Sequence, residues 1–116
     1  METKELNQHR AFAWGQCKKL DAKNTLAQTL RSRGLNVDDR SRSIAVRDCE
    51  CLTIEFDGRS EAEASIEGSA AALATLVKDV ELVEQALRAA DIEFWIEITD
   101  SAQNRLHYYN NRSLDH

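Results

Sequence analysis

The sequence predicts an α+β fold in which an antiparallel sheet of four to five strands packs against two main helices. Three patterns lead to this expectation: a seven-residue apolar repeat near the N-terminus, several short segments in which apolar and polar residues alternate, and a stripe at spacings of three and four over residues 70–90. The predicted element order is α-β-β-(β)-α-β-β, with the helices on one face of the sheet.

Residues 2–34 are predicted to be helical. Leu6, Ala13, Leu20 and Ala27 recur every seven positions, as one face of a helix requires. Both one long helix and two helices separated near Asp21 fit this pattern. Gly34 is a suitable residue to end the helix, because glycine adopts the left-handed conformation that often follows a last turn.

The middle of the chain predicts short strands. The polar segment 35–43 is expected to be a loop, and the alternating segments 44–46 and 52–56 are expected to be extended, separated by a turn or a bulge. Residues 61–67 are ambiguous, because Ser60 and Glu63 resemble a helix capping box whereas the segment itself alternates strictly. The alternation favours a strand, ended by Gly68 and followed by a helix that Ser69 caps.

Residues 70–90 give the clearest helix, and residues 92–99 and 105–109 predict a C-terminal hairpin. Phe94, Ile96 and Ile98 share one face of its first strand. Matching apolar faces places Ile98 opposite Leu106 and Ile96 opposite Tyr108.

A chain of 116 residues with 42% hydrophobic and 30% charged residues predicts a single domain over residues 1–116, with residues 110–116 as a frayed tail. The net charge of −5 is uneven: residues 1–60 contain 11 Lys/Arg against 9 Asp/Glu, and residues 61–116 contain 4 against 11. The acidic half argues against general binding to nucleic acid or to anionic membranes. No leader or membrane span is expected, and three cysteines, an odd number, favour a reducing, cytoplasmic location.

Cys49 and Cys51 form a C-x-C pair that would point the same way in a strand. A tetrahedral zinc site needs two further ligands, and Cys17, His9, His107 and His116 do not occur at ligand spacing. We therefore expect small residues packed on a sheet, with no metal and no cofactor, and keep a metal or redox role for this pair as an alternative.

No nucleophile, glycine-rich loop or paired general acid and base is recognisable, so the sequence predicts no catalytic residue. In the predicted hairpin register His107 lies opposite Glu97, a pairing that also occurs on ordinary protein surfaces.

The same register places Trp95 opposite Tyr109, on the face that does not carry the hairpin's apolar side chains. Together they define the predicted partner-binding patch, which consists of Trp95, Glu97, Arg105, His107 and Tyr109. Aromatic residues and arginine are favoured at protein interfaces. The alternative is that the N-terminal helix covers this face and makes Trp95 a core residue.

A second candidate is basic. Arg31, Arg33, Arg40 and Arg42 bracket a loop and could contact phosphates, although Asp38 and Asp39 lie between them and no aromatic residue is interleaved.

The sequence therefore predicts a small non-enzymatic protein-binding module, such as an inhibitor, an immunity protein, an antitoxin or a phage protein that occupies a partner's surface. A nucleic-acid-associated regulator using the arginines is the alternative. Unprotected edge strands would also permit a homodimer.

Overall fold

The computed structural model describes residues 10–57 and 61–111. Along the chain the elements are β1 (Ala11–Lys18), α2 (Ala22–Ser32), β2 (Val37–Asp39), β3 (Ser43–Val46), β4 (Leu52–Phe56), β5 (Glu63–Ala70), α3 (Leu73–Ala89), β6 (Glu93–Asp100) and β7 (Arg105–Asn110). All strands belong to one antiparallel sheet in the order β2-β3-β4-β5-β1-β6-β7.

The protein has an α+β fold, but the predicted architecture and element order were wrong. The sheet has seven strands instead of four or five, and among the described residues the first element is a strand instead of a helix. One strand, β1, was missed within residues 2–34, and another, β2, was missed within the segment 35–43. Residues 1–9 of the predicted helix lie outside the described part.

Strand β1 is central, between β5 and β6. Its burial alternates strictly, with Ala11, Ala13, Gly15 and Cys17 inward and Phe12, Trp14, Gln16 and Lys18 outward. Because the inward residues are small, the two-residue period of this strand is not visible in the spacing of its large apolar side chains. Two of the four residues in the seven-residue repeat, Ala13 and Leu20, lie outside any helix.

The chain leaves β1 through a short turn into α2. Asp21 has a left-handed backbone (φ 61°) and stands at the N-cap. Within residues 10–34, neither one long helix nor two helices separated near Asp21 is therefore present, because the strand β1 precedes this residue and only α2 follows it. The predicted glycine terminator is confirmed: Gly34 has φ 88°, and Leu35 N donates to Leu30 O across the last turn of α2.

Strands β2, β3 and β4 form one side of the sheet, with β2 at its edge. The predicted segments 44–46 and 52–56 appear as β3 and β4, joined by a turn rather than a bulge. Strand β2 was missed, because only three residues, Val37, Asp38 and Asp39, pair with β3 and two of them are acidic.

The choice of a strand over a helix for 61–67 is confirmed by β5, but its end was misplaced. The strand continues through Gly68 and Ser69 to Ala70. Gly68 allows close packing, since a Cβ there would lie 2.1 Å from Cys51 O. Ser69 therefore does not cap α3, whose N-cap is Ala72 without a side-chain hydrogen bond.

The C-terminal hairpin is present, but its predicted register is wrong by one position. Ile98 pairs with His107, Ile96 with Tyr109 and Thr99 with Arg105. Leu106 is thus an extra residue that forms a β-bulge. Because of this bulge, the side chains that follow Leu106 in β7 point to the face of the sheet opposite to the one predicted. Of the predicted tail 110–116, Asn110 belongs to β7 and the Asn111 side chain bonds Phe94 N and Ile92 O, while residues 112–116 lie outside the described part.

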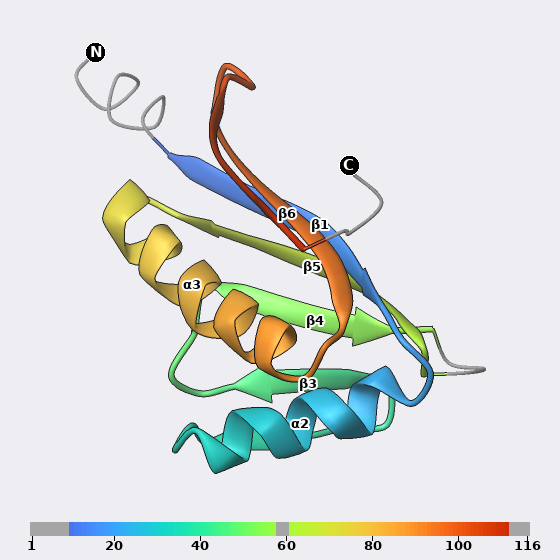
Figure 1. The fold of residues 1–116 in the computed structure, drawn as a ribbon. Helices are drawn as coiled ribbons and strands as arrows, with labels where there is room; N and C mark the ends of the chain where they lie inside the picture. Colours follow the sequence, from blue (N-terminus) through green and yellow to red (C-terminus); the bar gives the residue numbers. More distant parts are fainter. Residues whose placement is uncertain (1–9, 58–60, 112–116) are drawn as a thin grey trace.

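The molecule has two layers, in which α2 and α3 cover one face of the sheet (Figure 1). The core lies between these layers and is formed by α2 and α3 with the inward residues of the strands, among them Leu26, Leu76, Ile66, Phe94 and Ile96. The other face has no helix on it in the described residues, and we call it the open face. Neither α2 nor α3 is long and apolar enough to cross a membrane.

Candidate functional site: the open face of the sheet

The open face carries large apolar side chains in contact with solvent. Phe12, Trp14 and Tyr108 are 39%, 51% and 42% exposed. Trp14 meets Trp95 edge to face, with ring centroids 5.0 Å apart and ring planes at 82°. Such a pair holds both indoles in one arrangement. We call Phe12, Trp14, Trp95 and Tyr108 the aromatic cluster.

The sheet register explains why these residues share one face. Trp14 on β1 lies opposite Glu97 on β6, and Glu97 lies opposite Tyr108 on β7. On its other side Trp14 lies opposite Glu67 on β5. Side chains opposite one another on an antiparallel sheet point the same way, so tryptophan and tyrosine alternate with carboxylates along this row.

Arg105 on β7 lies opposite Thr99 and reaches this row with its side chain. Its Nε donates to Glu97 Oε2 at 2.7 Å, and its guanidinium lies 4.4 Å from the centre of the Tyr108 ring. The arginine is thus held by a carboxylate and an aromatic ring together.

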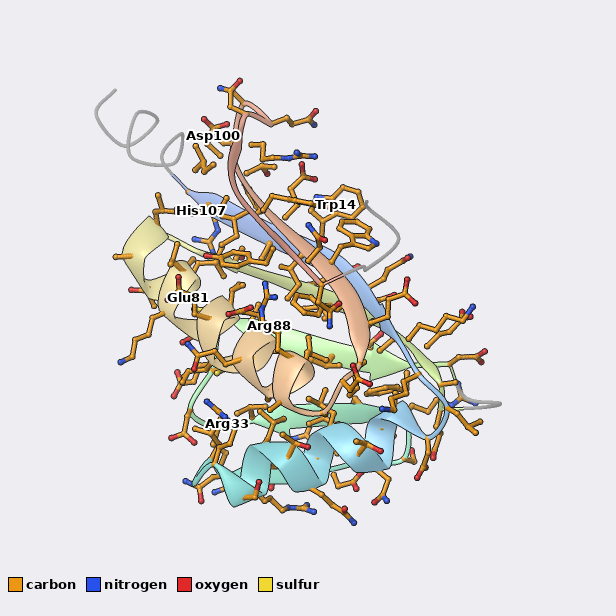
Figure 2. The ribbon with its side chains drawn as sticks, viewed as in Figure 1. Trp14, Arg33, Glu81, Arg88, Asp100 and His107 are labelled. Atoms are coloured by element: carbon orange, nitrogen blue, oxygen red, sulfur yellow. The ribbon has the colours of Figure 1, made fainter. Side chains whose placement is uncertain are left out.

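The predicted partner-binding patch divides between the two faces. Trp95, Glu97 and Arg105 lie together on the open face, as expected. His107 and Tyr109 do not join them, because the Leu106 bulge turns both residues toward α3; Trp14 and His107 lie on opposite sides of the hairpin (Figure 2). The predicted pairing of His107 with Glu97 is therefore wrong, and His107 stacks on Tyr109 at 6.1 Å.

Three residues of the open face were missed from the sequence: Phe12, Trp14 and Tyr108. The signal for the first two was available, since large residues alternate with Ala11, Ala13 and Gly15 along residues 11–15. Tyr108 was assigned to the wrong face by the register. The alternative that the N-terminal helix covers Trp95 is wrong for residues 10–34, because β1 lies beside β6 in the plane of the sheet and α2 lies on the opposite face.

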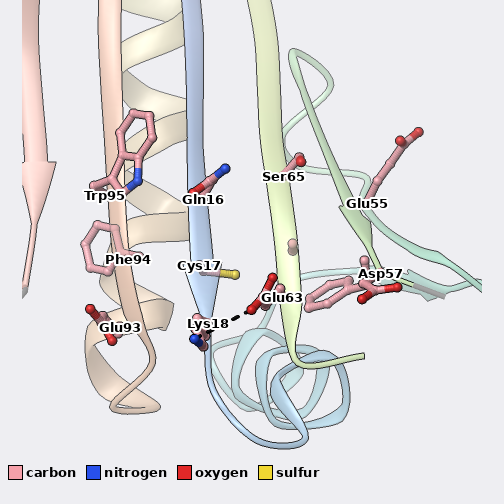
Figure 3. A pocket seen from close by; sticks show the side chains of 12 residues that line it. Gln16, Cys17, Lys18, Glu55, Asp57, Glu63, Ser65, Glu93, Phe94 and Trp95 are labelled. Carbon is pink, nitrogen blue, oxygen red and sulfur yellow. Dashed lines mark ion pairs between the residues drawn. The ribbon is translucent and has the colours of Figure 1, made fainter. Parts of the chain in front are cut away.

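Two shallow hollows mark the open face. The first is lined by residues of β4, β5, β1 and β6 and by Asp57, with Trp95 and Glu93 on one side, Glu55 and Asp57 on the other, and Glu63 between them (Figure 3). Among the described residues that line it, Lys18 is the one cation, and it pairs with Glu63 at 3.6 Å.

The second hollow lies beside Trp14, over β1, β5 and β4. Its walls are Phe12, Trp14, three glutamates (Glu50, Glu55 and Glu67) and the hydroxyls of Thr53, Ser65 and Ser69. No lysine or arginine lines it among the described residues. Arg10 reaches its end by donating to Ser69 Oγ at 3.1 Å.

The cysteine pair lies elsewhere and has a different environment from the one expected. Cys49 and Cys51 lie in the turn between β3 and β4, not in a strand, and Cys49 Sγ donates to Asp79 O at 3.6 Å. Burial, followed by the charge of Asp79, raises the pKa of the Cys49 thiol to about 12. Burial also raises the pKa of Cys51. These shifts disfavour the thiolate that metal binding and redox chemistry require.

Within the described residues no group of three or more His, Cys, Asp or Glu side chains could hold a metal ion. Cys17 is buried in β1, and His9 and His116 lie outside the described residues.

The candidate arginines are mostly engaged in contacts within the protein. Arg31 donates to Val37 O, Arg33 to Gln85 Oε1, and Arg40 is 3.9 Å from Asp38. Arg42 is exposed in the loop before β3. The contacts of Arg31 and Arg33 link the end of α2 to β2 and α3, whereas Arg40 pairs with its near neighbour Asp38.

A scan against protein-family models, a search of curated proteins and a search of solved structures each found no match to this chain.

Proposed function

We propose that this protein is a small, non-enzymatic protein-binding module that acts by occupying a partner's surface with the open face of its sheet. The observation that carries the proposal is the reversed arrangement of β1, where Phe12 and Trp14 face solvent and Ala11, Ala13 and Gly15 face the helices. Exposing large aromatic residues forgoes the free energy that their burial would contribute, so such an arrangement favours a surface that is buried on binding.

The rigidity of the surface supports the same proposal. The aromatic cluster stands on the adjacent strands β1, β6 and β7, and the edge-to-face contact of Trp14 with Trp95 favours one mutual arrangement of the two rings. Binding to a preorganised aromatic surface loses little conformational entropy. Tryptophan, tyrosine and arginine are also the residues that most often dominate interface energetics.

The test is a comparison of partner capture by the full chain and by a Trp14→Ser, Tyr108→Ser variant, quantified from lysate of the native host. Because both side chains are exposed, the variant is expected to fold, which a thermal melt checks. We expect recovery of a partner to fall at least about tenfold, the effect of losing one interface anchor.

The matched control is Leu20→Ser, which removes a side chain that is 87% exposed in the turn after β1, outside the open face. Its recovery should equal that of the unmodified chain. Equal recovery by the double variant and the control would show that the open face is not the contact surface.

A further inference from the structure

The second hollow has the chemistry of a site for a cationic side chain. The outward side chain of Trp14 forms one wall, and Glu67 stands directly opposite Trp14 on the neighbouring strand. Within the described residues neither Glu67 nor Glu55 has an ion-pair partner. An aromatic face beside unneutralised carboxylates attracts a cation through two separate interactions.

The surrounding surface is mainly acidic, with Arg10 as a cation at the Ser69 end of the hollow. On β4, β5, β1 and β6 the open face carries Glu55, Glu63, Glu67, Glu93 and Glu97, and among the described residues of these strands Lys18 is the one cation facing the same way. A partner that covers this region must bring positive charge or leave the carboxylates of Glu55 and Glu67 buried without compensation.

The protein already contains one example of this mode of binding, next to the hollow. Arg105 stacks on Tyr108 and bonds Glu97, which is adjacent to Trp14 in the same row of the sheet. On the other side of Trp14, Glu67 repeats the pairing of a carboxylate with an aromatic ring, and no arginine of residues 10–57 or 61–111 forms an ion pair with it.

We propose that the hollow between Trp14 and Glu67 binds an arginine side chain of an arginine-bearing segment of the partner protein. This inference rests on the proposed function and specifies the chemistry of the partner. A guanidinium fits better than an ammonium, because its plane stacks on an indole while its edge donates to a carboxylate. The same carboxylates repel phosphate groups, so a nucleic acid does not fit this face.

The test uses the 15N-labelled full chain and the two indole N–H signals of its two tryptophans, assigned with Trp95→Phe. The probe is the peptide acetyl-(Arg-Ser)3-amide, with analogues in which lysine or uncharged citrulline replaces arginine. We expect a saturable shift of the Trp14 signal with the arginine peptide, at least about threefold weaker binding of the lysine peptide, and no saturation with citrulline.

Two variants of equal charge provide the matched comparison. Glu67→Gln and Glu63→Gln each remove one carboxylate from the same face of β5. Glu63 lines the other hollow and is paired with Lys18. We expect Glu67→Gln to weaken binding of the arginine peptide at least about threefold and Glu63→Gln to change it by less than about twofold.

Equal effects of the two variants would overturn the proposal in favour of nonspecific attraction to an acidic surface. Equal binding of the lysine or citrulline peptide would remove the guanidinium assignment, and tighter saturation by a single-stranded oligonucleotide would assign the face to nucleic acid. If the arginine peptide does not bind but partner capture still depends on Trp14 and Tyr108, the arginine site is wrong and the proposed function stands. If partner capture does not depend on Trp14 and Tyr108, both the arginine site and the proposed function are wrong.

Discussion

Side-chain size along β1 runs opposite to the usual order of burial. Alanine and glycine face the helices, whereas phenylalanine and tryptophan face solvent. The small inward residues lie where α3 passes over β1, and the large outward residues form the aromatic cluster. One strand thus serves helix packing on one face and the proposed binding surface on the other.

Gly15 shows how closely β1 and β6 pack. A Cβ at this position would lie 2.1 Å from Trp95 O and 2.8 Å from Ile96 Cα, and both are backbone atoms that cannot move alone. We expect Gly15→Ala to lower the free energy of unfolding by about 1–3 kcal/mol in urea denaturation. The control Ser65→Ala, at an exposed position of β5, should change it by less than about 0.5 kcal/mol. An unchanged midpoint for Gly15→Ala would contradict this packing.

The thiols give a prediction about reactivity. Burial raises the pKa of both Cys17 and Cys49 to about 12, so at pH 8 only about one thiol in ten thousand is ionised. Reaction with a disulfide reagent should be slow for these two cysteines in the folded protein and rapid for all three in urea. Rapid labelling of Cys49 under native conditions would restore the redox alternative.

Tyr109 gives a prediction about pH. Burial, followed by the nearby Glu81 carboxylate, raises its pKa to about 12, and its hydroxyl donates to Glu81 Oε2 at 3.4 Å. Because the folded state favours the neutral phenol, stability should fall as pH rises from about 10 to 12. The measurement is an absorbance titration of Tyr109 in a Tyr108→Phe background. Glu81→Gln should lower the pKa of Tyr109, although burial should still keep that pKa above its ordinary value. A pKa that Glu81→Gln leaves unchanged would contradict the contact between Tyr109 and Glu81.

At the scale of elements, the sequence predicted α3, β3, β4, β5 and the two strands of the hairpin, because their apolar residues are regularly spaced and, except in β5, mostly large. It could not predict the hairpin register, since the bulge at Leu106 depends on how the turn closes. In that turn Asp100 accepts bonds from Ala102 N and Asn104 N. A single extra residue moved two of the five expected partner-binding residues to the other face.

The junction of α2 and β2 depends on a partly buried ion pair between Lys23 and Asp39. Asp39→Ala leaves the Lys23 ammonium buried without a partner, and we expect a loss of about 1–3 kcal/mol in the free energy of unfolding. Lys23→Met, Asp39→Ala together should recover most of that loss, because methionine can occupy the buried stem position. Additive losses in the double variant, measured in urea, would show that the pair is not coupled.

At the scale of the whole molecule, the sequence could predict the α+β class and the acidic C-terminal half, which follow from composition and local periodicity. It could not predict that β1 enters between β5 and β6. That placement joins residues more than 50 positions apart, such as Trp14 with Glu67 and Glu97, and nothing local in the chain specifies it. The open face, with its aromatic cluster and both hollows, exists only because of this long-range pairing.

The central position of β1 is therefore the claim on which the fold and the proposed surface both depend, and nuclear Overhauser contacts measure it most directly. We predict cross-strand contacts from Trp14 to both Glu67 and Glu97, and contacts between the two indole rings. Contacts between residues i and i+3 along 11–18, as in a helix, without any to β5 or β6, would contradict the account.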